Sequence, residues 1–289
     1  MSRLDLDDYS IERPFDFALR ATIGCGGIAR EAFFPKSEES FVRLLEYLET
    51  EGKAYRVLGC LSNVLPADGV SKRAVICTKR MKDIREENGV YIEAGVTAGA
   101  LLRYCRKVGL SGAEFLTGIP CTLGGALYMN AGVSGEYIAD TVEFVKAYID
   151  GKVERLSVAE CGYSYKNSAF MQNGAVILGA KIKWKRTDTE TVENRIAIYE
   201  KRRAHLPKGR SMGCVFKNPQ GYVAGKLIEG AGLKDYRFGG ARISKEHANF
   251  IINDGHATSE DIKNLIAVVK NAVFAQYKIV LQEEIRYLD

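Results

Sequence analysis

The run GCVFKNP places a thiol, Cys214, among groups that usually surround an anionic ligand. Lys217 offers an ammonium group and Asn218 an amide, and Pro219 ends the strand-like residues 214–216 because it lacks a backbone N–H. Two interpretations of the thiol are open at this point. Taken alone, the run favours packing of Cys214 as a small hydrophobic group over a chemical role.

A second group of polar side chains lies in the run YSYKNSAF, shortly before a predicted strand at residues 175–184. Lys166 supplies a cation there, next to Tyr165, and such a cation can hold a carboxylate or polarise a carbonyl group. Most lysines face water, and the run alone favours that interpretation. Near the end of the chain, Glu283 and Glu284 are neighbours in a predicted strand, so their side chains lie on opposite faces and only one can face a site.

Three glycine-rich runs offer backbone amides that no side chain obstructs. LGCLSN, residues 58–63, follows a predicted strand and suits either an ordinary turn, which is favoured, or a phosphate-binding loop. GIPCTLGGALYMNAG, residues 118–132, brings Gly124 and Gly125 to the start of a predicted helix near Leu123, where amides suit a pyrophosphate as well as tight packing. The third run is GCGGIA. None has the spacing of a Rossmann or P-loop motif.

The pattern of apolar residues predicts an α+β fold that must position these runs. The predicted helices are residues 37–52, 97–108, 193–205, 223–231 and 258–277, and the predicted strands are residues 55–59, 74–78, 90–94, 142–149, 153–156, 175–184, 249–252 and 280–287. Ser37 is the expected cap of the first helix, Gly109 ends the second, and Thr258 with Asp261 resembles a capping box. The polar residues 185–194 are expected to form a boundary.

Length and composition exclude several classes of protein. The chain has 289 residues, of which 46% are hydrophobic, enough for two or three lobes. Seven cysteines without a Cys-x-x-Cys pair and three histidines without helical spacing indicate reduced thiols and no metal site. A net charge of +5 is too mild for a nucleic-acid-binding protein. Without a leader pattern or an apolar span, the chain is expected in the cytoplasm, bound to no membrane.

In this order the motifs resemble those of one family, UDP-N-acetylenolpyruvoylglucosamine reductase, also called UDP-N-acetylmuramate dehydrogenase, of bacterial peptidoglycan synthesis. The resemblance covers nearly the whole chain, from about Thr22 to Leu288. LGCLSN is similar to the family's LGxGSN loop, GIPCTLGGALYMNAG to GIPGTVGGAxxMNAG, YSYKNSAF to xxYRxSxF, GCVFKNPQGYVAGKLIEGAGLK to GSxFKNPxxxxAGxLIxxxGLK, and LQEEIRYL to LEPEVRxL. Each motif alone is weak, whereas their combination is specific.

The resemblance implies the compact subclass of the family and an α+β architecture. Its first part is a two-subdomain FAD-binding fold of the vanillyl-alcohol-oxidase type, and its second is a C-terminal α+β substrate lobe. We assign residues 1–190 to FAD binding, with subdomains at about 1–79 and 80–190, and residues 191–289 to substrate binding. The implied reaction uses FAD and NADPH to reduce UDP-N-acetylglucosamine enolpyruvate to UDP-N-acetylmuramate, and a monomer is expected.

The resemblance also assigns roles to residues. Hydride that reaches the terminal carbon of the enolpyruvyl group pushes negative charge onto the adjacent carbon and its carboxylate, so a cation and a proton donor are needed there. Lys166 and Cys214 match those two positions, and Glu284 matches the family's terminal carboxylate. The expected cofactor-binding residues are Gly59, Cys60, Leu61, Ser62, Asn63, Gly118, Thr122, Gly124, Gly125 and Asn130. The expected substrate-binding residues are Tyr165, Lys217, Asn218, Arg202 and His247.

Four residues depart from the family's pattern. The proton donor is ordinarily serine and the carboxylate-binding cation arginine, so Cys214 brings a larger and oxidisable atom and Lys166 lacks the two-pronged guanidinium. Leu61 and Cys121 replace glycines of the FAD loops and crowd the approach to a pyrophosphate. The substitutions at the donor and cation positions favour an alternative, a divergent paralogue that keeps the fold as a nucleotide-binding or regulatory module with little or no reductase activity. The retention of Asn63, Asn130, Asn218 and Glu284 favours the enzyme.

Overall fold

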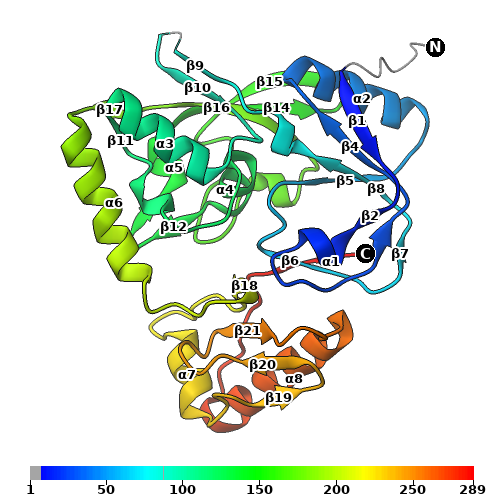
Figure 1. Ribbon diagram of the computed structural model, residues 1–289, viewed down its shortest axis with the longest axis vertical. Helices are drawn as coiled ribbons and strands as arrows, with labels where there is room; N and C mark the ends of the chain where they lie inside the picture. Colours follow the sequence, from blue (N-terminus) through cyan, green and yellow to red (C-terminus); the bar gives the residue numbers. More distant parts are fainter. Residues whose placement is uncertain (1–7, 87) are drawn as a thin grey trace. The chain divides into compact units, whose positions relative to one another are not determined.

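The computed structural model describes residues 8–86 and 88–289 (Figure 1). The first seven residues, on which the expectation about a leader partly depends, lie outside the described residues. The chain divides into two compact units. Unit 1 consists of the described part of Met1–Glu12, Glu31–Cys60 and Ala74–Ala204. Unit 2 consists of Arg13–Arg30, Leu61–Arg73 and His205–Asp289, so these units do not coincide with the predicted domain limits.

Unit 1 contains a four-stranded sheet in the order β1-β4-β8-β5, with bounds Tyr9–Glu12, Ala32–Pro35, Ala74–Cys77 and Tyr55–Leu58. β1 is antiparallel to its neighbour, and the other pairs are parallel. Helix α2, Glu38–Thr50, packs on this sheet and buries Phe41, Leu44, Leu45 and Leu48. Ser37 caps it as predicted, because its hydroxyl accepts the Ser40 N–H at 3.2 Å.

The second sheet of unit 1 is antiparallel, in the order β15-β14-β16-β10-β9 (Figure 1). Its strands are Lys152–Ser157, Val142–Ile149, Val176–Ile182, Val90–Glu93 and Ile84–Glu86. The helices that pack with it include α3 Ala98–Val108, α4 Leu123–Met129, α5 Ile138–Thr141 and α6 Thr189–Arg203. Short elements complete the unit: β11 Leu110–Ser111 with β17 Lys185–Arg186, β12 Gly132–Val133 with β13 Glu136–Tyr137, and 3-10 turns at Thr78–Arg80, Glu114–Leu116 and Ala169–Met171.

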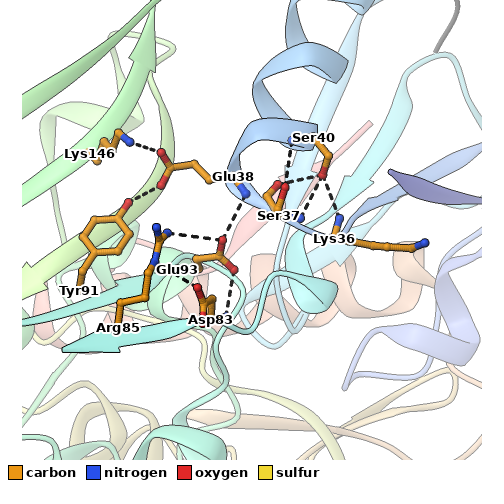
Figure 2. A network of polar contacts seen from close by, with 9 residues as sticks. All are labelled: Lys36, Ser37, Glu38, Ser40, Asp83, Arg85, Tyr91, Glu93 and Lys146. Atoms are coloured by element: carbon orange, nitrogen blue, oxygen red, sulfur yellow. Dashed lines mark hydrogen bonds and ion pairs between the residues drawn. The ribbon is translucent and has the colours of Figure 1, made fainter. Parts of the chain in front are cut away.

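A buried polar network joins the start of α2 to the five-stranded sheet (Figure 2). The Glu38 carboxylate accepts hydrogen bonds from the Tyr91 hydroxyl at 2.5 Å and from the Lys146 ammonium. The Glu93 carboxylate accepts the backbone N–H groups of Glu38 at 3.2 Å and Asp83 at 3.0 Å. Burial raises the pKa of Glu93, and the two N–H groups oppose that shift because they bind the ionised form. Within unit 1, this network therefore fixes α2 against strands from a separate sheet.

Unit 2 is built from three stretches of sequence and a smaller antiparallel sheet. That sheet has the order β18-β21-β20-β19, with bounds Arg210–Cys214, Phe250–Asn253, Ala241–Ile243 and Arg237–Phe238. Helices α7, Ala224–Gly230, and α8, Ser259–Tyr277, belong to it, and Thr258 with Asp261 forms the predicted capping box of α8. The remaining elements are α1 Phe17–Arg20, the sheet β2 Phe15–Asp16, β3 Ile28–Ala29 and β7 Val70–Ser71, and the pair β6 Val64–Pro66 with β22 Arg286–Leu288.

Two predicted elements are wrong in their limits. The strand expected at residues 280–287 is short, since β22 covers only Arg286–Leu288, where it pairs in parallel with β6, and Val280 is 67% exposed. The expected boundary at residues 185–194 contains β17 and the first turn of α6, because Asp188 caps that helix by accepting the Thr191 N–H at 2.7 Å. A polar run can thus be a well-capped, solvent-facing helix start.

The described helices are too short or too polar to cross a lipid bilayer.

Candidate active site

The segment that carries Cys214 leaves the sheet of unit 2 at an irregularity. β18 pairs with β21, and the register of this pair shifts between Ser211 and Cys214. Gly213 has φ of 76°, a left-handed conformation that residues with a Cβ rarely adopt. Gly213 therefore allows the backbone to leave its pairing with β21. Cys214 itself is half-buried.

Beyond Cys214 the chain runs beside the C-terminal residues of unit 2. The N–H of Glu284 donates to the carbonyl of Val215 at 2.7 Å, and the N–H of Lys217 donates to the carbonyl of Gln282 at 2.8 Å. These bonds are antiparallel strand pairing over a very short length. The structure thus places two of the three predicted catalytic residues, Cys214 and Glu284, on adjacent segments of one unit.

Asn218 and Lys217 follow directly on that segment. The Asn218 side-chain oxygen accepts the N–H of Ala224 at 3.0 Å, and Ala224 is the first residue of α7. One function of Asn218 is therefore to cap α7 across the intervening turn. Lys217 is half-buried, and the binding of substrate by both residues stays a prediction.

Lys166, the third predicted catalytic residue, lies at the tip of a tight turn in unit 1. Ser164 and Asn167 exchange backbone hydrogen bonds of 3.1 and 3.2 Å across the turn, and Lys166 has φ of 53°. Tyr165, beside it, is 44% exposed. A lysine in the left-handed region is uncommon and is strained backbone that its surroundings must hold in place.

Asn130 provides part of that hold. It ends α4 in the left-handed conformation, with φ of 44°, and is buried. Its side chain donates to the carbonyl of Ser164 at 3.0 Å and accepts the N–H of Ala139 at 3.3 Å. The amide predicted to bind cofactor is thus used to fasten the turn of Lys166 to the end of α4.

The run LGCLSN has the open backbone that an anionic ligand needs. Within residues 8–86 and 88–289, the five consecutive amides from Gly59 to Asn63 donate no hydrogen bond to any protein group. Gly59 permits close approach in unit 1, because a Cβ on it would stand 2.3 Å from the Thr122 hydroxyl oxygen. In unit 2, Asn63 donates from its side chain to the carbonyl of Glu284 at 3.2 Å. Such a backbone suits a phosphate-binding loop, and phosphate binding by this run stays a prediction.

The second predicted cradle, at the start of α4, is different. The N–H groups of Leu123 and Gly124 donate to the carbonyls of Val96 and Ala94, both at 2.8 Å, and the N–H of Gly125 donates to the Thr122 hydroxyl at 3.2 Å. The first turn of this short helix is satisfied within unit 1 and has no free amide for a phosphate, which corrects the expectation of a helix N-terminus aimed at one. In the described chain, the amides of Gly118 and Thr122 remain without a partner.

The departures at the loop glycines have measurable consequences. Leu61 has φ of 52°, a left-handed conformation that glycine adopts without strain and leucine does not. Its side chain is only 5% exposed, and this burial offsets the strain of the backbone. Burial raises the pKa of the Cys121 thiol to about 12 and also raises the pKa of the Cys60 thiol. Both sulfurs are thus protonated at neutral pH and add no charge that would repel a phosphate.

Two predicted substrate residues are engaged elsewhere. In unit 1, the guanidinium of Arg202 lies over the Tyr199 ring at 5.3 Å, whereas its neighbour Arg203 donates to the carbonyl of Gly118 at 3.2 Å. In unit 2, the His247 ring nitrogen Nδ1 accepts the N–H of Asn249 at 3.3 Å, and burial lowers the pKa of His247. Arg203, and not Arg202, thus bonds the glycine run, and the binding of substrate by Arg202 and His247 stays a prediction.

The arrangement therefore fits a cofactor with a pyrophosphate group better than a metal. Main-chain amides in succession bind anionic oxygens without a counter-charge. Among residues 8–86 and 88–289, no group of three or more His, Cys, Asp or Glu side chains could hold a metal ion.

Comparison with protein families gives two matches in separate parts of the chain. Residues 29–157 match a family described as FAD binding domain. Residues 204–288 match a family described as UDP-N-acetylenolpyruvoylglucosamine reductase, C-terminal domain.

Similar proteins match nearly the whole chain. The UDP-N-acetylenolpyruvoylglucosamine reductase of Caldicellulosiruptor saccharolyticus is 35% identical over 273 residues, covering 92% of this chain and 88% of that one. The reductase of Streptococcus suis is 36% identical over 301 residues, covering 99% and 96%. The crystal structure of UDP-N-acetylenolpyruvylglucosamine reductase from Thermus caldophilus superposes with a TM-score of 0.84 at 32% identity, covering 97% of this chain and 100% of that one.

Proposed function

The chain belongs to the UDP-N-acetylenolpyruvoylglucosamine reductase family, and we propose from this that it reduces UDP-N-acetylglucosamine enolpyruvate to UDP-N-acetylmuramate with NADPH. It is an FAD-dependent oxidoreductase of peptidoglycan precursor synthesis, as the resemblance of its motifs implied. The expected α+β fold with an FAD-binding part is likewise confirmed. The observation that carries the residue assignment is the strand-like pairing that places Cys214 beside the segment of Glu284.

The cofactor-binding role of the glycine loops is supported by the open amides. FAD, when bound, carries hydride from NADPH to the substrate. Its pyrophosphate would be held in unit 1 by the N–H groups of Gly59 and Cys60, with those of Gly118 and Thr122 as further donors, and the open amides continue along the chain to Leu61, Ser62 and Asn63. Gly124, Gly125 and Asn130 shape unit 1 around α4 and the turn of Lys166, and so support the loops rather than donate to the phosphates.

Lys166 and Glu284 act on the charge that develops in the substrate. Addition of hydride to the terminal carbon of the enolpyruvyl group makes its adjacent carbon and carboxylate electron-rich. The Lys166 ammonium holds that carboxylate and stabilises the charge as it appears, although a single ammonium orients it less firmly than a guanidinium. Glu284 helps to orient the same groups. Tyr165, Lys217, Asn218, Arg202 and His247 are proposed to bind the rest of the substrate.

Cys214 donates the proton that completes the reduction. The adjacent carbon becomes a strong base, and the thiol, with a reference pKa of about 8.5, is a better acid than the serine hydroxyl of the family pattern. The S–H bond breaks as the new C–H bond forms, and solvent then restores the proton to sulfur. The larger sulfur shifts the position of the donated proton, so the efficiency of this step depends on how the segment of Cys214 is held.

The alternative, a paralogue that binds nucleotide without turnover, is distinguished by two measurements on one preparation. The purified protein is reconstituted with FAD, its absorbance is recorded between about 350 and 500 nm, and NADPH oxidation is followed with and without the enolpyruvyl substrate. We expect a bound flavin and oxidation that depends on substrate. Bound flavin without that dependence would establish the alternative, and absence of flavin binding would exclude both.

Substitution of the thiol tests its role directly. Cys214→Ala is expected to leave flavin reduction by NADPH unchanged and to slow reoxidation by substrate at least about 100-fold, as loss of a general acid does. Cys214→Ser, which restores the family's donor, should keep or raise turnover. Normal turnover by Cys214→Ala would mean that the thiol only packs.

The proposal extends to the state of the protein. We propose that it acts as a monomer in the cytoplasm, as expected from the sequence. Its proposed substrates are small anions, because its ligand groups are main-chain amides, lysine and amide side chains. Sedimentation velocity of the FAD-bound protein would contradict this if it gave a stable dimer.

A further inference from the structure

We propose that Asn249 is a positioning residue that holds the proton-donor segment in register, an inference that rests on the proposed function of Cys214. Its side-chain oxygen accepts the N–H of Phe216 at 2.9 Å, and its side-chain nitrogen donates to the carbonyl of the same residue at 2.8 Å. Its backbone carbonyl also accepts the N–H of Val215 at 2.8 Å. Asn249 precedes the first residue of β21, and its side chain pairs with the backbone of Phe216 as a neighbouring strand would.

The backbone N–H and carbonyl of Phe216 are both bonded to the Asn249 side chain. The opposite edge of the segment is bonded to the C-terminal residues, through the N–H of Glu284 to Val215 and the N–H of Lys217 to Gln282. Phe216 and Glu283 form a non-hydrogen-bonded antiparallel pair, because the two bonds that flank it join Val215 to Glu284 and Lys217 to Gln282, and in such a pair the N–H and carbonyl point away from the partner. Those two groups of Phe216 therefore face away from the C-terminal segment, where the Asn249 amide bonds both.

Few side chains could replace the Asn249 amide at this position. Phe216 is 2% exposed and Asn249 is 3% exposed, so no water replaces a lost bond easily. An amide offers one acceptor and one donor in a plane, which matches the N–H and carbonyl of an extended residue. The backbone of Asn249 is held as well, since its N–H donates to His247 Nδ1 at 3.3 Å. Gly225 of α7 permits this packing, because a Cβ there would lie 3.2 Å from the His247 ring.

The consequence concerns reaction geometry more than stability. Cys214 lies two residues before Phe216 and Lys217 one residue after it, so a shift of Phe216 moves both groups. A misplacement of about 1 Å in a reacting group can lower a rate about 100-fold. Within the described part of unit 2, the Asn249 amide bonds Phe216, which belongs to neither glycine run, so flavin reduction should not depend on it.

The chain contains a matched control four residues further on. Asn253 is 4% exposed, lies in β21 and makes four hydrogen bonds through its side chain. It donates to the carbonyls of Ile23 and Gly24 at 2.9 and 3.0 Å and accepts the N–H groups of Gly255 and Ala257 at 2.8 and 3.0 Å. Loss of this amide should destabilise unit 2 by at least as much, without touching the segment of Cys214.

The experiment compares Asn249→Ala with Asn253→Ala in the FAD-bound protein. Stopped-flow absorbance measures flavin reduction by NADPH and, separately, reoxidation of the reduced flavin by the enolpyruvyl substrate. We expect Asn249→Ala to reduce flavin at the wild-type rate, to reoxidise about 100-fold more slowly and to show an increased solvent deuterium isotope effect, because proton donation becomes limiting. Asn253→Ala should lower the melting temperature without changing the reoxidation rate or its isotope effect.

Asn249→Asp should make the reoxidation rate depend on pH in a way that a purely structural role would not give. A protonated aspartate can accept the Phe216 N–H and donate to its carbonyl, whereas the carboxylate sets a negative oxygen against that carbonyl. The ratio of variant to wild-type reoxidation rates should therefore fall as pH rises through the pKa of the new group. Both proteins share the other titratable or charged groups near this position. These groups are Cys214, Lys217, His247, Glu283 and Glu284, with Lys226 and Glu229 on α7. The ratio to the wild-type rate at each pH therefore controls for their effect.

The outcomes separate this inference from the proposed function. If wild-type flavin is reduced by NADPH but not reoxidised by substrate, both proposals are overturned. If the wild type turns over while Asn249→Ala and Asn253→Ala behave alike, only the positioning role of Asn249 is overturned. Should Asn249→Ala fail to fold, the pH profile of Asn249→Asp decides, and a ratio that does not change with pH overturns the inference.

Discussion

Two loops that look alike as sequence differ in how their backbones are used. The run around Gly59 has five consecutive amides with no partner in the described chain, whereas the run around Gly124 has its helix-start amides bonded to Ala94, Val96 and Thr122. Both contain glycine, a small polar residue and a cysteine, and each has a bulkier residue, Leu61 or Cys121, in place of a family glycine. The amides of the first run have no protein acceptor in the described chain, and those at the helix start of the second run are bonded within unit 1.

The difference shows that glycine serves two purposes here. A Cβ on Gly124 would lie 3.0 Å from the Ala94 Cβ, so this glycine allows α4 to pack on the end of β10. A Cβ on Gly59 would meet the hydroxyl of Thr122, so that glycine allows two loops of unit 1 to touch while its own amide stays free. The loop around Gly124 therefore packs against the loop around Gly59 and supports it. The following predictions test this difference between the two loops.

The thiols of the two loops should differ in reactivity, and this is the largest effect we expect. Because burial raises the pKa of Cys121 to about 12, its thiolate fraction at pH 8 is about a thousandfold below that of a free cysteine. Iodoacetamide labelling of Cys121 in the FAD-free protein should be slower by a similar factor and should rise about tenfold per pH unit, since ionisation stays incomplete.

Cys60 provides the comparison within the same sample. Burial raises the pKa of its thiol, and the charge of Lys79 lowers it, so it should label faster than Cys121. Peptide mass spectrometry quantifies both sites at several pH values, and added FAD should protect Cys60 because this residue lies on the open loop. Equal labelling of the two cysteines, unaffected by FAD, would show that both loops are equally closed.

A methyl group at residue 59 should weaken flavin binding strongly. In Gly59→Ala the new Cβ meets the Thr122 hydroxyl at 2.3 Å, and the relief of such an overlap costs about 1–3 kcal/mol. We expect FAD affinity, measured by fluorescence titration, to fall about 10- to 100-fold, which is that energy expressed as a ratio. Thr122→Ala in the same chain removes the hydroxyl and should restore part of the affinity, while loss of affinity without rescue would place the clash elsewhere.

Much of the fold could be predicted from the sequence because its signals are local. Ser37, Thr97 and Gly109 specify the ends of their helices through caps and a left-handed terminus, and the structure has those ends. The terminal strand could not be limited correctly, since β22 exists only where β6 lies beside it. Such pairing joins residues far apart in sequence, and no local pattern encodes it.

The candidate site was predictable as motifs but not as contacts. Family resemblance marked Cys214, Lys166 and Glu284, and the pairing of the segments that hold two of them emerged only from the structure. Asn249 gave no signal, because an asparagine that begins a predicted strand is unremarkable until Phe216 lies opposite it. Sequence shows which groups are present, and tertiary structure decides which of their hydrogen bonds remain available.

Removal of the Leu61 side chain should weaken the fold although it restores the family's glycine. The left-handed backbone of Leu61 costs about 1–2 kcal/mol, whereas deletion of a buried leucine side chain costs about 2–5 kcal/mol. Leu61→Gly should therefore lower the free energy of unfolding by about 1–3 kcal/mol, measured by urea denaturation and circular dichroism. A more stable variant would mean that strain dominates and that this loop is poorly adapted.

The smallest effect concerns Gly125, where the two uses of glycine can be separated. A Cβ there would meet only the Thr122 hydroxyl, at an ordinary 3.4 Å, so nothing in the described chain requires glycine for packing. Alanine is a better helix former than glycine by about 1 kcal/mol, and Gly125→Ala should raise stability by up to that amount, while Gly124→Ala, with its 3.0 Å contact, should lower it. If the cofactor approaches Gly125, as the family resemblance implies, FAD affinity falls several-fold in a protein that melts at a higher temperature. Unchanged affinity would restrict cofactor contact in this run to Gly118 and Thr122, and the distinction between an open loop and a closed loop would then be complete.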